Sequence, residues 1–279
     1  MTETVVHRLR PDAGDDGIFL VHPAGGSIFG YRAFARHSRF SGALNALAFP
    51  TELAASRPDI PGLAAYYLAE VRKTQPHGPY LLGGYSFGGT VAFEMARQLQ
   101  ESGEDVRRLI MFDALPPESY VDCLRAEEDV LDAAPLLLRT LIPRTRQAQR
   151  GESTPKTVDE AIGRVAPPHW TAMATAAYRQ FLVNWMVHCA ALADYRPRGR
   201  LRCNVTLFTA SEPRPELFGR MRVGQVPMRR WQAHIDGELE TAALPGDHYT
   251  MFGDPACLRT LAEAADEVLA RYESAATIR

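Results

Sequence analysis

Three features that would place a chain in a specialised class of protein are missing from this sequence. Its cysteines have neither metal-ligand spacing nor a disulfide pattern; they are Cys123, Cys189, Cys203 and Cys257. Basic and acidic residues nearly balance to a net charge of −2, so nothing favours a nucleic-acid partner. No apolar run reaches the roughly 18 residues of a membrane span, and residues 1–16 hold no apolar signal core. We therefore expect a soluble, cytoplasmic protein with no metal and no membrane or nucleic-acid partner.

Short apolar runs alternate with amphipathic stretches along much of the chain. Strands are predicted at residues 17–22, 45–49, 79–83, 106–112, 202–210 and 238–244. Helices are predicted at residues 63–74, 89–100 and 256–272, and one could start at 31–37. Strand–helix–strand order with short links indicates parallel βαβ units. The sequence thus predicts a single α/β domain over residues 1–279, with a mostly parallel twisted sheet flanked by helices.

Residues 119–197 break this alternation and show helical patterns without a convincing strand. The best helices are at residues 120–130, 133–141 and 170–194, and the polar stretch 143–157 between them predicts a mobile link. Insertions of roughly this length are usually functional rather than passive. We expect this one to form a helical lid.

The strongest chemical signal is the sequence GYSFGG at residues 84–89, which follows a predicted strand and opens a predicted helix. This is the context of a nucleophile elbow, in which a serine occupies a strained turn between strand and helix. Gly84 and Gly88 let the two elements pass closely, and the helix N-terminus supplies positive potential where negative charge develops. The alternative is a glycine-rich turn that merely contains a serine. The strand and helix around it favour Ser86 as a nucleophile.

A serine hydroxyl needs a base to take its proton, and in this fold the chain order is serine, acid, histidine. Four histidines follow Ser86. His169 and His188 fall in the helical insertion, and His234 stands in polar sequence before a strand. His248 lies in a turn between an apolar strand and the last helix, at the carboxyl edge of the sheet. His248 is therefore the candidate base.

The acid has two credible candidates, each at the end of a predicted strand. Asp113 ends the apolar run 109–112, where a carboxylate is costly unless it has a partner. Glu212 follows the next strand in a sequence that looks solvated. Asp247 adjoins His248, but sequence neighbours usually point apart. We favour Asp113, whose task is to fix the tautomer of the base and stabilise the imidazolium.

Acyl transfer passes through a tetrahedral anion, so two backbone donors are also expected. One is the N–H of Phe87, directly after the nucleophile. The second should come from the loop HPAGG at residues 22–26, where small residues let the backbone approach the substrate. Ala24 is our choice and Gly25 the next; a simple turn is the alternative.

These motifs together resemble the thioesterases that release products from non-ribosomal peptide synthetases and polyketide synthases. Three stretches carry the likeness: residues 21–27 with Tyr31; residues 75–89 continued by 92–96; and Asp113 with Pro116, followed by 246–248. The resemblance covers most of the sheet-based core and fades in the insertion. The second stretch is long and specific, whereas a bare G-x-S-x-G is not.

The resemblance implies an α/β-hydrolase fold and a serine thioesterase. Ser86 would take an acyl, peptidyl or polyketidyl chain from the phosphopantetheine thiol of a carrier protein or domain. The acyl-enzyme would then be opened by water, or by an internal amine or hydroxyl in a macrocyclisation. The resemblance further implies an acid after the sixth strand, matching Asp113 rather than Glu212, and a mobile lid. It implies no cofactor beyond the arm that delivers the substrate.

The sequence Tyr85-Ser86-Phe87 resembles that of integrated, product-releasing thioesterases, whereas separate proofreading thioesterases more often have His-Ser-Met around the serine. The chain begins at Met1 with no carrier domain before it. That fits a stand-alone enzyme with releasing-type sequence or an excised domain, so editing of misprimed carrier proteins stays open beside release.

Two other functions remain to be weighed. A carboxylesterase or peptidase of the same fold shares the elbow, because sites rather than folds carry function. A non-catalytic binding module is the third hypothesis, and the intact Ser86, Asp113 and His248 speak against it.

Overall fold

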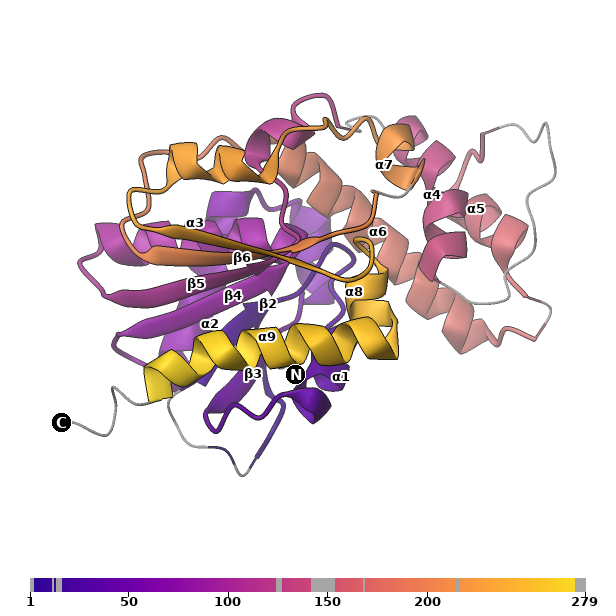
Figure 1. The fold of residues 1–279 in the computed structure, drawn as a ribbon. Helices are drawn as coiled ribbons and strands as arrows, with labels where there is room; N and C mark the ends of the chain where they lie inside the picture. The colour runs from indigo at the N-terminus through magenta and orange to yellow at the C-terminus, as the bar shows by residue number, and fades with distance from the viewer. Residues whose placement is uncertain are drawn as a thin grey trace.

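In the part of the chain that the structure describes, seven strands form one sheet, and helices cover both of its faces (Figure 1). The computed structural model describes residues 3–11, 13, 17–123, 127–141, 154–167, 169–213 and 216–273. The strands are β1 (Val6–Arg8), β2 (Gly17–Val21), β3 (Ala43–Leu47), β4 (Tyr80–Tyr85), β5 (Val106–Phe112), β6 (Asn204–Ala210) and β7 (Leu239–Leu244). They lie in the order β1-β3-β2-β4-β5-β6-β7, and every neighbouring pair is parallel except β1 and β3. The predicted fold, a mostly parallel sheet flanked by helices, is confirmed.

The α-helices within the described residues vary from one turn to six. They are α1 (Phe29–His37), α2 (Ile60–Thr74), α3 (Phe87–Glu101), α4 (Glu127–Leu141), α5 (Val158–Val165), α6 (Ala172–Asp194), α7 (Glu216–Arg220), α8 (Thr250–Gly253) and α9 (Pro255–Glu273). Three 3₁₀ helices are η1 (Thr51–Ser56), η2 (Pro117–Tyr120) and η3 (Met228–His234). Side-chain caps mark several starts: Asp59 accepts the N–H of Gly62 at 2.8 Å at the start of α2.

Alternate residues of each central strand face opposite sides and build two hydrophobic cores. On β2, Phe19 and Val21 pack in the core that contains α2 and α3, whereas Ile18 and Leu20 pack with α1 and α9. All four side chains are at most 1% exposed. Burial on both faces explains why the central strands read as continuous apolar runs. The carboxyl ends of the parallel strands then share one edge, where their loops can carry functional side chains.

Helices α4, α5 and α6 fill the connection between β5 and β6, and the described part of this connection contains no strand. The helix predicted at residues 133–141 is confirmed, but it belongs to a longer helix, α4, which begins at Glu127. The separate helix predicted at residues 120–130 is wrong, because only the last four of the described residues in that range are α-helical and they form the start of α4. Helix α4 continues through Pro135, because its apolar stripe of Val130, Ala134 and Leu137 is unbroken. Helix α5 is short and was not predicted. Residues 143–153 of the expected mobile link lie outside the described residues, and the lid role of the insertion stays a prediction.

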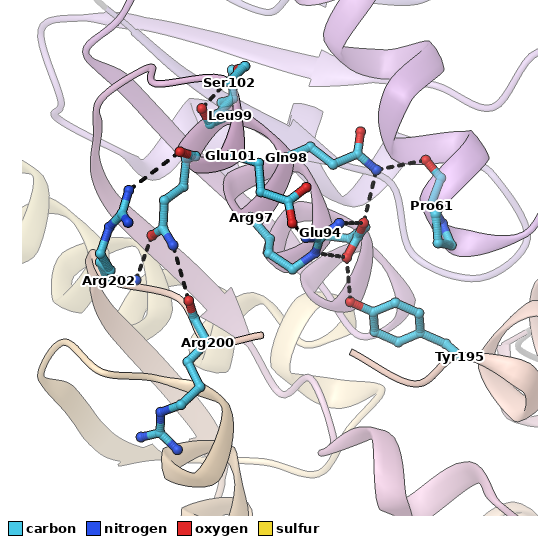
Figure 2. A network of polar contacts seen from close by, with 11 residues as sticks. Pro61, Glu94, Arg97, Gln98, Leu99, Glu101, Ser102, Tyr195, Arg200 and Arg202 are labelled. Carbon is cyan, nitrogen blue, oxygen red and sulfur yellow. Dashed lines mark hydrogen bonds and ion pairs between the residues drawn. The ribbon is translucent and has the colours of Figure 1, made fainter. Parts of the chain in front are cut away.

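The end of α6 is tied to α3 through one buried carboxylate (Figure 2). Glu94 of α3 is 1% exposed and accepts hydrogen bonds from Arg97 (2.7 and 2.8 Å), Gln98 (2.9 Å) and Tyr195 (2.8 Å). Tyr195 follows α6 directly, and Gln98 also donates to the carbonyl of Pro61 in α2 at 2.9 Å. The insertion is thus anchored at its C-terminal end to the two helices that cover one face of the sheet.

Two expectations about strands need correction. β1 was not predicted, because three residues at an antiparallel edge are too few for a periodic signal. Asp113 follows β5, the fifth strand of this chain rather than the sixth. Within the described residues, no helix is both long and apolar enough to cross a membrane. The cytoplasmic location stays a prediction.

Candidate active site

Ser86 occupies a tight turn between β4 and α3. Its backbone lies at φ +56° and ψ −123°, a strained conformation for a residue with a Cβ. A Cβ on Gly84 would lie 2.2 Å from the backbone of Gly88, and one on Gly88 would lie 2.1 Å from the carbonyl oxygen of Val21. The Ser86 N–H donates to the carbonyl of Phe112 at 2.8 Å, which fixes the turn to β5. This is the strand–serine–helix geometry that the GYSFGG sequence predicts.

His248 and Asp113 meet at the carboxyl edge of the sheet. Nδ1–H of His248, on the loop between β7 and α8, donates to Oδ2 of Asp113 at 2.7 Å. The other carboxylate oxygen accepts the N–H of Ala210 at 2.9 Å. Asp113 has φ +42°, and its side chain is 3% exposed against 6% for His248. The hydrogen bond fixes the tautomer with a bare Nε2, which is the state a general base needs.

The competing candidates lie elsewhere. Glu212 is exposed, and Asp247 accepts the N–H groups of Tyr249 and Thr250 at 2.8 Å, so it shapes the turn before α8. Neither is hydrogen-bonded to His248. His234 is paired with Glu118 at 3.1 Å in η3, and His169 is exposed at the start of the inserted helix.

Ser86 and His248 line the same cavity of about 240 Å³. The hydroxyl of Tyr85, the residue before Ser86, donates a hydrogen bond to the His248 carbonyl, and the centroids of the Tyr85 and His248 rings lie 5.1 Å apart. The residue that precedes the serine therefore holds the loop that carries the histidine.

The rest of the cavity wall is largely apolar and includes residues of the insertion. Leu137 and Leu141 come from α4, and Phe181, Trp185 and Cys189 from α6. No Asp, Glu, Lys or Arg lines the cavity within the described residues. The site therefore suits an uncharged, largely apolar ligand.

The two expected backbone donors differ in their surroundings from Gly25, the other candidate. Ala24 lines the cavity, and its N–H has no hydrogen-bond partner within the described residues. The N–H of Phe87 is the first of α3 and has no intrahelical partner. The N–H of Gly25 donates to Nδ1 of His188 at 3.2 Å. These contacts favour Ala24 over Gly25.

A family model, the thioesterase domain, matches residues 17–265 of the chain. The chain belongs to this thioesterase family. The predicted resemblance is confirmed, and with it the assignment of the chain to thioester-hydrolysing enzymes.

Curated relatives of this thioesterase include fungal synthetases and polyketide synthases. The chain is 28% identical over 256 residues to the inactive atromentin synthetase invA6 of Paxillus involutus, covering 84% of this chain and 25% of that protein. It is 36% identical over 130 residues to the non-reducing polyketide synthase PKS16 of Cladonia grayi, covering 41% of this chain and 6% of that protein. The thioesterase thus spans a quarter or less of the length of these relatives.

Solved structures resemble it over almost the whole chain. One is a four-domain non-ribosomal peptide synthetase in its holo form, with 26% identity, a TM-score of 0.76, and coverage of 96% of this chain and 20% of that one. Another is the NocB thioesterase domain in covalent complex with a fluorophosphonate nocardicin G analogue, with 25% identity, a TM-score of 0.66, and coverage of 95% and 99%.

The structural roles of Tyr31 and His22 were not predicted from the sequence, although both residues lie in the stretches that carry the family likeness. The Tyr31 hydroxyl donates to the Val21 carbonyl at 2.6 Å and accepts the Tyr85 N–H at 2.8 Å, joining the end of β2 to the elbow. His22 is fully buried, and burial lowers its pKa to about 4. Its Nδ1 donates to the Pro23 carbonyl at 2.8 Å, which orients the start of the loop. Such contacts leave no periodic signal.

Metal-binding potential is low within the described residues, where no group of three or more His, Cys, Asp or Glu side chains could hold an ion. The cysteines are free thiols, and Cys123 and Cys189 are buried. The chemistry available at the site is that of a serine hydroxyl, an imidazole–carboxylate pair and backbone amides.

Proposed function

We propose that this thioesterase transfers an acyl, peptidyl or polyketidyl chain from a carrier-protein thioester to Ser86 and then releases it. The single observation that carries the proposal is the buried His248–Asp113 pair beside the strained Ser86 turn, at a cavity that both Ser86 and His248 line. Three features support an acyl-transfer triad: the chain order serine, acid, histidine, the hydrogen bond between acid and histidine, and the cavity that serine and histidine both line.

In the first half of the proposed cycle, the bare Nε2 of His248 takes the proton of the Ser86 hydroxyl. The serine oxygen attacks the thioester carbonyl, and the carbonyl electrons move to oxygen. The N–H groups of Ala24 and Phe87 stabilise that oxyanion, and Asp113 stabilises the imidazolium. When the anion collapses, the carbon–sulfur bond breaks and the thiol leaves with the proton from His248.

In the second half, His248 takes a proton from water or from a hydroxyl or amine of the bound chain. That nucleophile attacks the Ser86 ester, and the proton returns to the serine oxygen as the product leaves. Water gives a linear acid, and an internal nucleophile gives a ring. The three side chains and two amides supply all the chemistry of this cycle, so we expect no cofactor.

The carrier-protein partner is supported by the relatives. Their names describe synthetases and polyketide synthases, and one structural neighbour is a four-domain non-ribosomal peptide synthetase. The thioester in such systems is carried on a phosphopantetheine arm, as the sequence resemblance implies. The apolar cavity favours an acyl chain without charge near Ser86.

The test is a comparison of acyl-pantetheine thioesters with oxygen esters that carry the same acyl group. We expect kcat/KM to be higher for the thioester, and Ser86→Ala to abolish turnover of both. Faster turnover of the oxygen ester would assign the chain to carboxylesterases instead. Mass spectrometry of the products from longer peptidyl and polyketidyl thioesters distinguishes linear acids from rings. Preference for short acyl groups on a carrier protein would indicate editing rather than release.

A further inference from the structure

The inserted helix α6 lies directly on the loop that we assign to the oxyanion hole. We propose that His188 and Asn184 of this helix are positioning residues, which hold Gly25 and thereby aim the neighbouring Ala24 N–H at the developing oxyanion. The inference rests on the proposed acyl-transfer function and adds two residues to it. Neither residue lines the cavity, so each would act through the loop.

Both polar groups of Gly25 are bound by α6. Its N–H donates to Nδ1 of His188 at 3.2 Å, and its carbonyl accepts from Nδ2 of Asn184 at 3.2 Å. Residues 184 and 188 are four apart and so share one face of the helix. Gln180, one turn earlier, donates to Oδ1 of Asn184 at 2.8 Å, which keeps the NH₂ group of Asn184 toward Gly25. The result is a line of three polar side chains that ends on the loop.

Helix α6 packs tightly against the loop at residues 22–26. Gly25 has φ +97°, and a Cβ there would lie 2.0 Å from the ring of Phe181. Gly26 has φ +87°, and a Cβ there would lie 2.8 Å from the Phe49 side chain and 3.0 Å from Nδ2 of Asn184. Only glycine fits these two positions without strain, so the loop conformation and the helix position depend on each other.

His188 also contacts the other proposed donor. Its ring stacks on the ring of Phe87, with centroids 4.3 Å apart and planes inclined by 24°. One side chain therefore bonds to the amide next to Ala24 and packs on the side chain of the residue that supplies the second N–H. The positions of both proposed oxyanion-hole donors, the N–H groups of Ala24 and Phe87, therefore depend on contacts with α6.

The tautomer of His188 follows from these contacts. Nδ1 accepts a hydrogen bond, so the neutral ring carries its proton on Nε2, which is buried without a partner within the described residues. Burial, with a smaller effect from the nearby His22, holds the pKa of His188 well below its usual range. The buried Nε2–H of His188 has no partner among the described residues and so destabilises the fold, while Nδ1 of the same ring holds Gly25. A positioning role for His188 accounts for the presence of this destabilising group.

Two substitutions at one position separate positioning from packing. His188→Phe keeps the ring stacked on Phe87 and loses the acceptor. His188→Asn loses the ring and keeps an acceptor, because Oδ1 of asparagine lies as many bonds from Cα as Nδ1 of histidine. If His188 positions the loop, His188→Phe lowers kcat about tenfold to a hundredfold with KM little changed, since a misaimed donor loses part of the effect of a missing one. The His188→Asn variant should then have a higher kcat than His188→Phe, although its melting temperature should be lower.

Two further variants complete the set. Asn184→Asp removes the donor to the Gly25 carbonyl and should lower kcat in the same way. Val187→Ala, at a buried neighbour on α6 that does not bond to the loop, should lower the melting temperature and leave kcat unchanged.

The readouts are kcat and KM on an acyl-pantetheine thioester and, independently, the rate of Ser86 phosphonylation by a fluorophosphonate, whose transition state also places charge on oxygen. The positioning role is overturned if His188→Phe keeps the wild-type values of both, or if His188→Asn is the slower variant in both. A wild-type protein that is phosphonylated but turns over no thioester would refute the proposed function while the phosphonylation rates still decide the positioning role.

Discussion

Asp113 is the residue at which the physical argument from sequence is strongest. A carboxylate that ends an apolar strand is costly without partners, and its partners in the structure include Nδ1–H of His248 and the N–H of Ala210. Glu212, one strand further along, is exposed and needs none. Asp113 is buried and bonded to His248, whereas Glu212 is exposed, and this difference distinguishes the two candidate acids that the sequence left open.

Their contributions to activity should differ sharply. Asp113→Asn removes the charge that stabilises the imidazolium and favours the wrong tautomer, so kcat should fall about 10³–10⁴-fold. Glu212→Gln changes an exposed side chain, and kcat should stay within about twofold. Steady-state kinetics on one thioester measures both. Equal losses, or a larger loss at Glu212, would mean that the acid is misassigned.

Ser86 gives a second prediction at this scale, about strain. Its φ of +56° disfavours any residue with a Cβ, a cost that glycine avoids. Ser86→Ala keeps the strain and Ser86→Gly relieves it, so the glycine variant should unfold with a free energy about 1 kcal/mol higher than the alanine variant. Urea titrations of the two inactive proteins provide the comparison. A less stable glycine variant contradicts a strained elbow.

The residues whose roles were not predicted from the sequence share one property. His188, Asn184 and Tyr31 act through hydrogen bonds to backbone groups far away in the chain, such as the 3.2 Å bond between Gly25 and His188. His188 was set aside because it lies in the insertion. The available signal was the spacing of Gln180, Asn184 and His188, which are four residues apart and so share one face of a helix. The group that this face contacts could not be predicted from the sequence.

At the scale of elements, the buried carboxylate of Glu94 joins α2, α3 and the end of α6 (Figure 2). Burial alone would raise the pKa of Glu94, but hydrogen bonds from Arg97, Gln98 and Tyr195 outweigh burial and hold the pKa below its usual range. Because the folded-state pKa lies below the unfolded one, the ionised carboxylate stabilises the fold above about pH 4.5. That contribution is lost as the pH falls through the folded-state pKa.

Glu94→Gln should therefore lower the free energy of unfolding by about 2 kcal/mol at pH 7 and reduce its decline below pH 4.5. Glu101→Gln is the matched control: Glu101 also pairs with Arg97 but is 64% exposed, so its loss should cost less than about 0.5 kcal/mol. Denaturant titrations between pH 3 and 7 give both quantities. An unchanged pH dependence in Glu94→Gln would contradict the account of this network.

Element prediction succeeded where both faces of a strand are buried, as in β5, whose predicted bounds of 106–112 are those observed. It failed where an element is short, since β1 has three residues and α5 has eight. It also divided one helix into two, because a break was predicted between residues 130 and 133, where α4 runs without interruption from Glu127 to Leu141. In the insertion, tertiary contacts rather than local propensity decide where helices begin and end.

At the scale of the whole molecule, the sheet side and the described part of the insertion line a largely apolar cavity at the carboxyl edge of the sheet. Ser86 and His248 come from the sheet side, and Phe181 and Trp185 from α6. The composition of that wall could not be predicted, because it depends on how the insertion folds over the sheet. It decides which acyl chains can approach Ser86.

An acyl chain with a carboxylate near the thioester should be a poor substrate. The described wall of the cavity offers no basic side chain to pair with it. Relative to an apolar chain of equal length, kcat/KM should fall about tenfold to a hundredfold, since burying an unpaired polar group costs a few kcal/mol. A matched pair of acyl-pantetheines that differ only in the terminal methyl or carboxylate makes this measurement. Equal rates would show that the acyl chain does not enter this cavity.

The covalent step is the centre of the account, and intact-protein mass spectrometry with peptide mapping tests it most directly. After rapid mixing with one equivalent of an acyl-pantetheine, we expect a single acyl group on Ser86, one free thiol released per acyl group, and no adduct in Ser86→Ala. An adduct on another residue, or turnover that persists in Ser86→Ala, would contradict it.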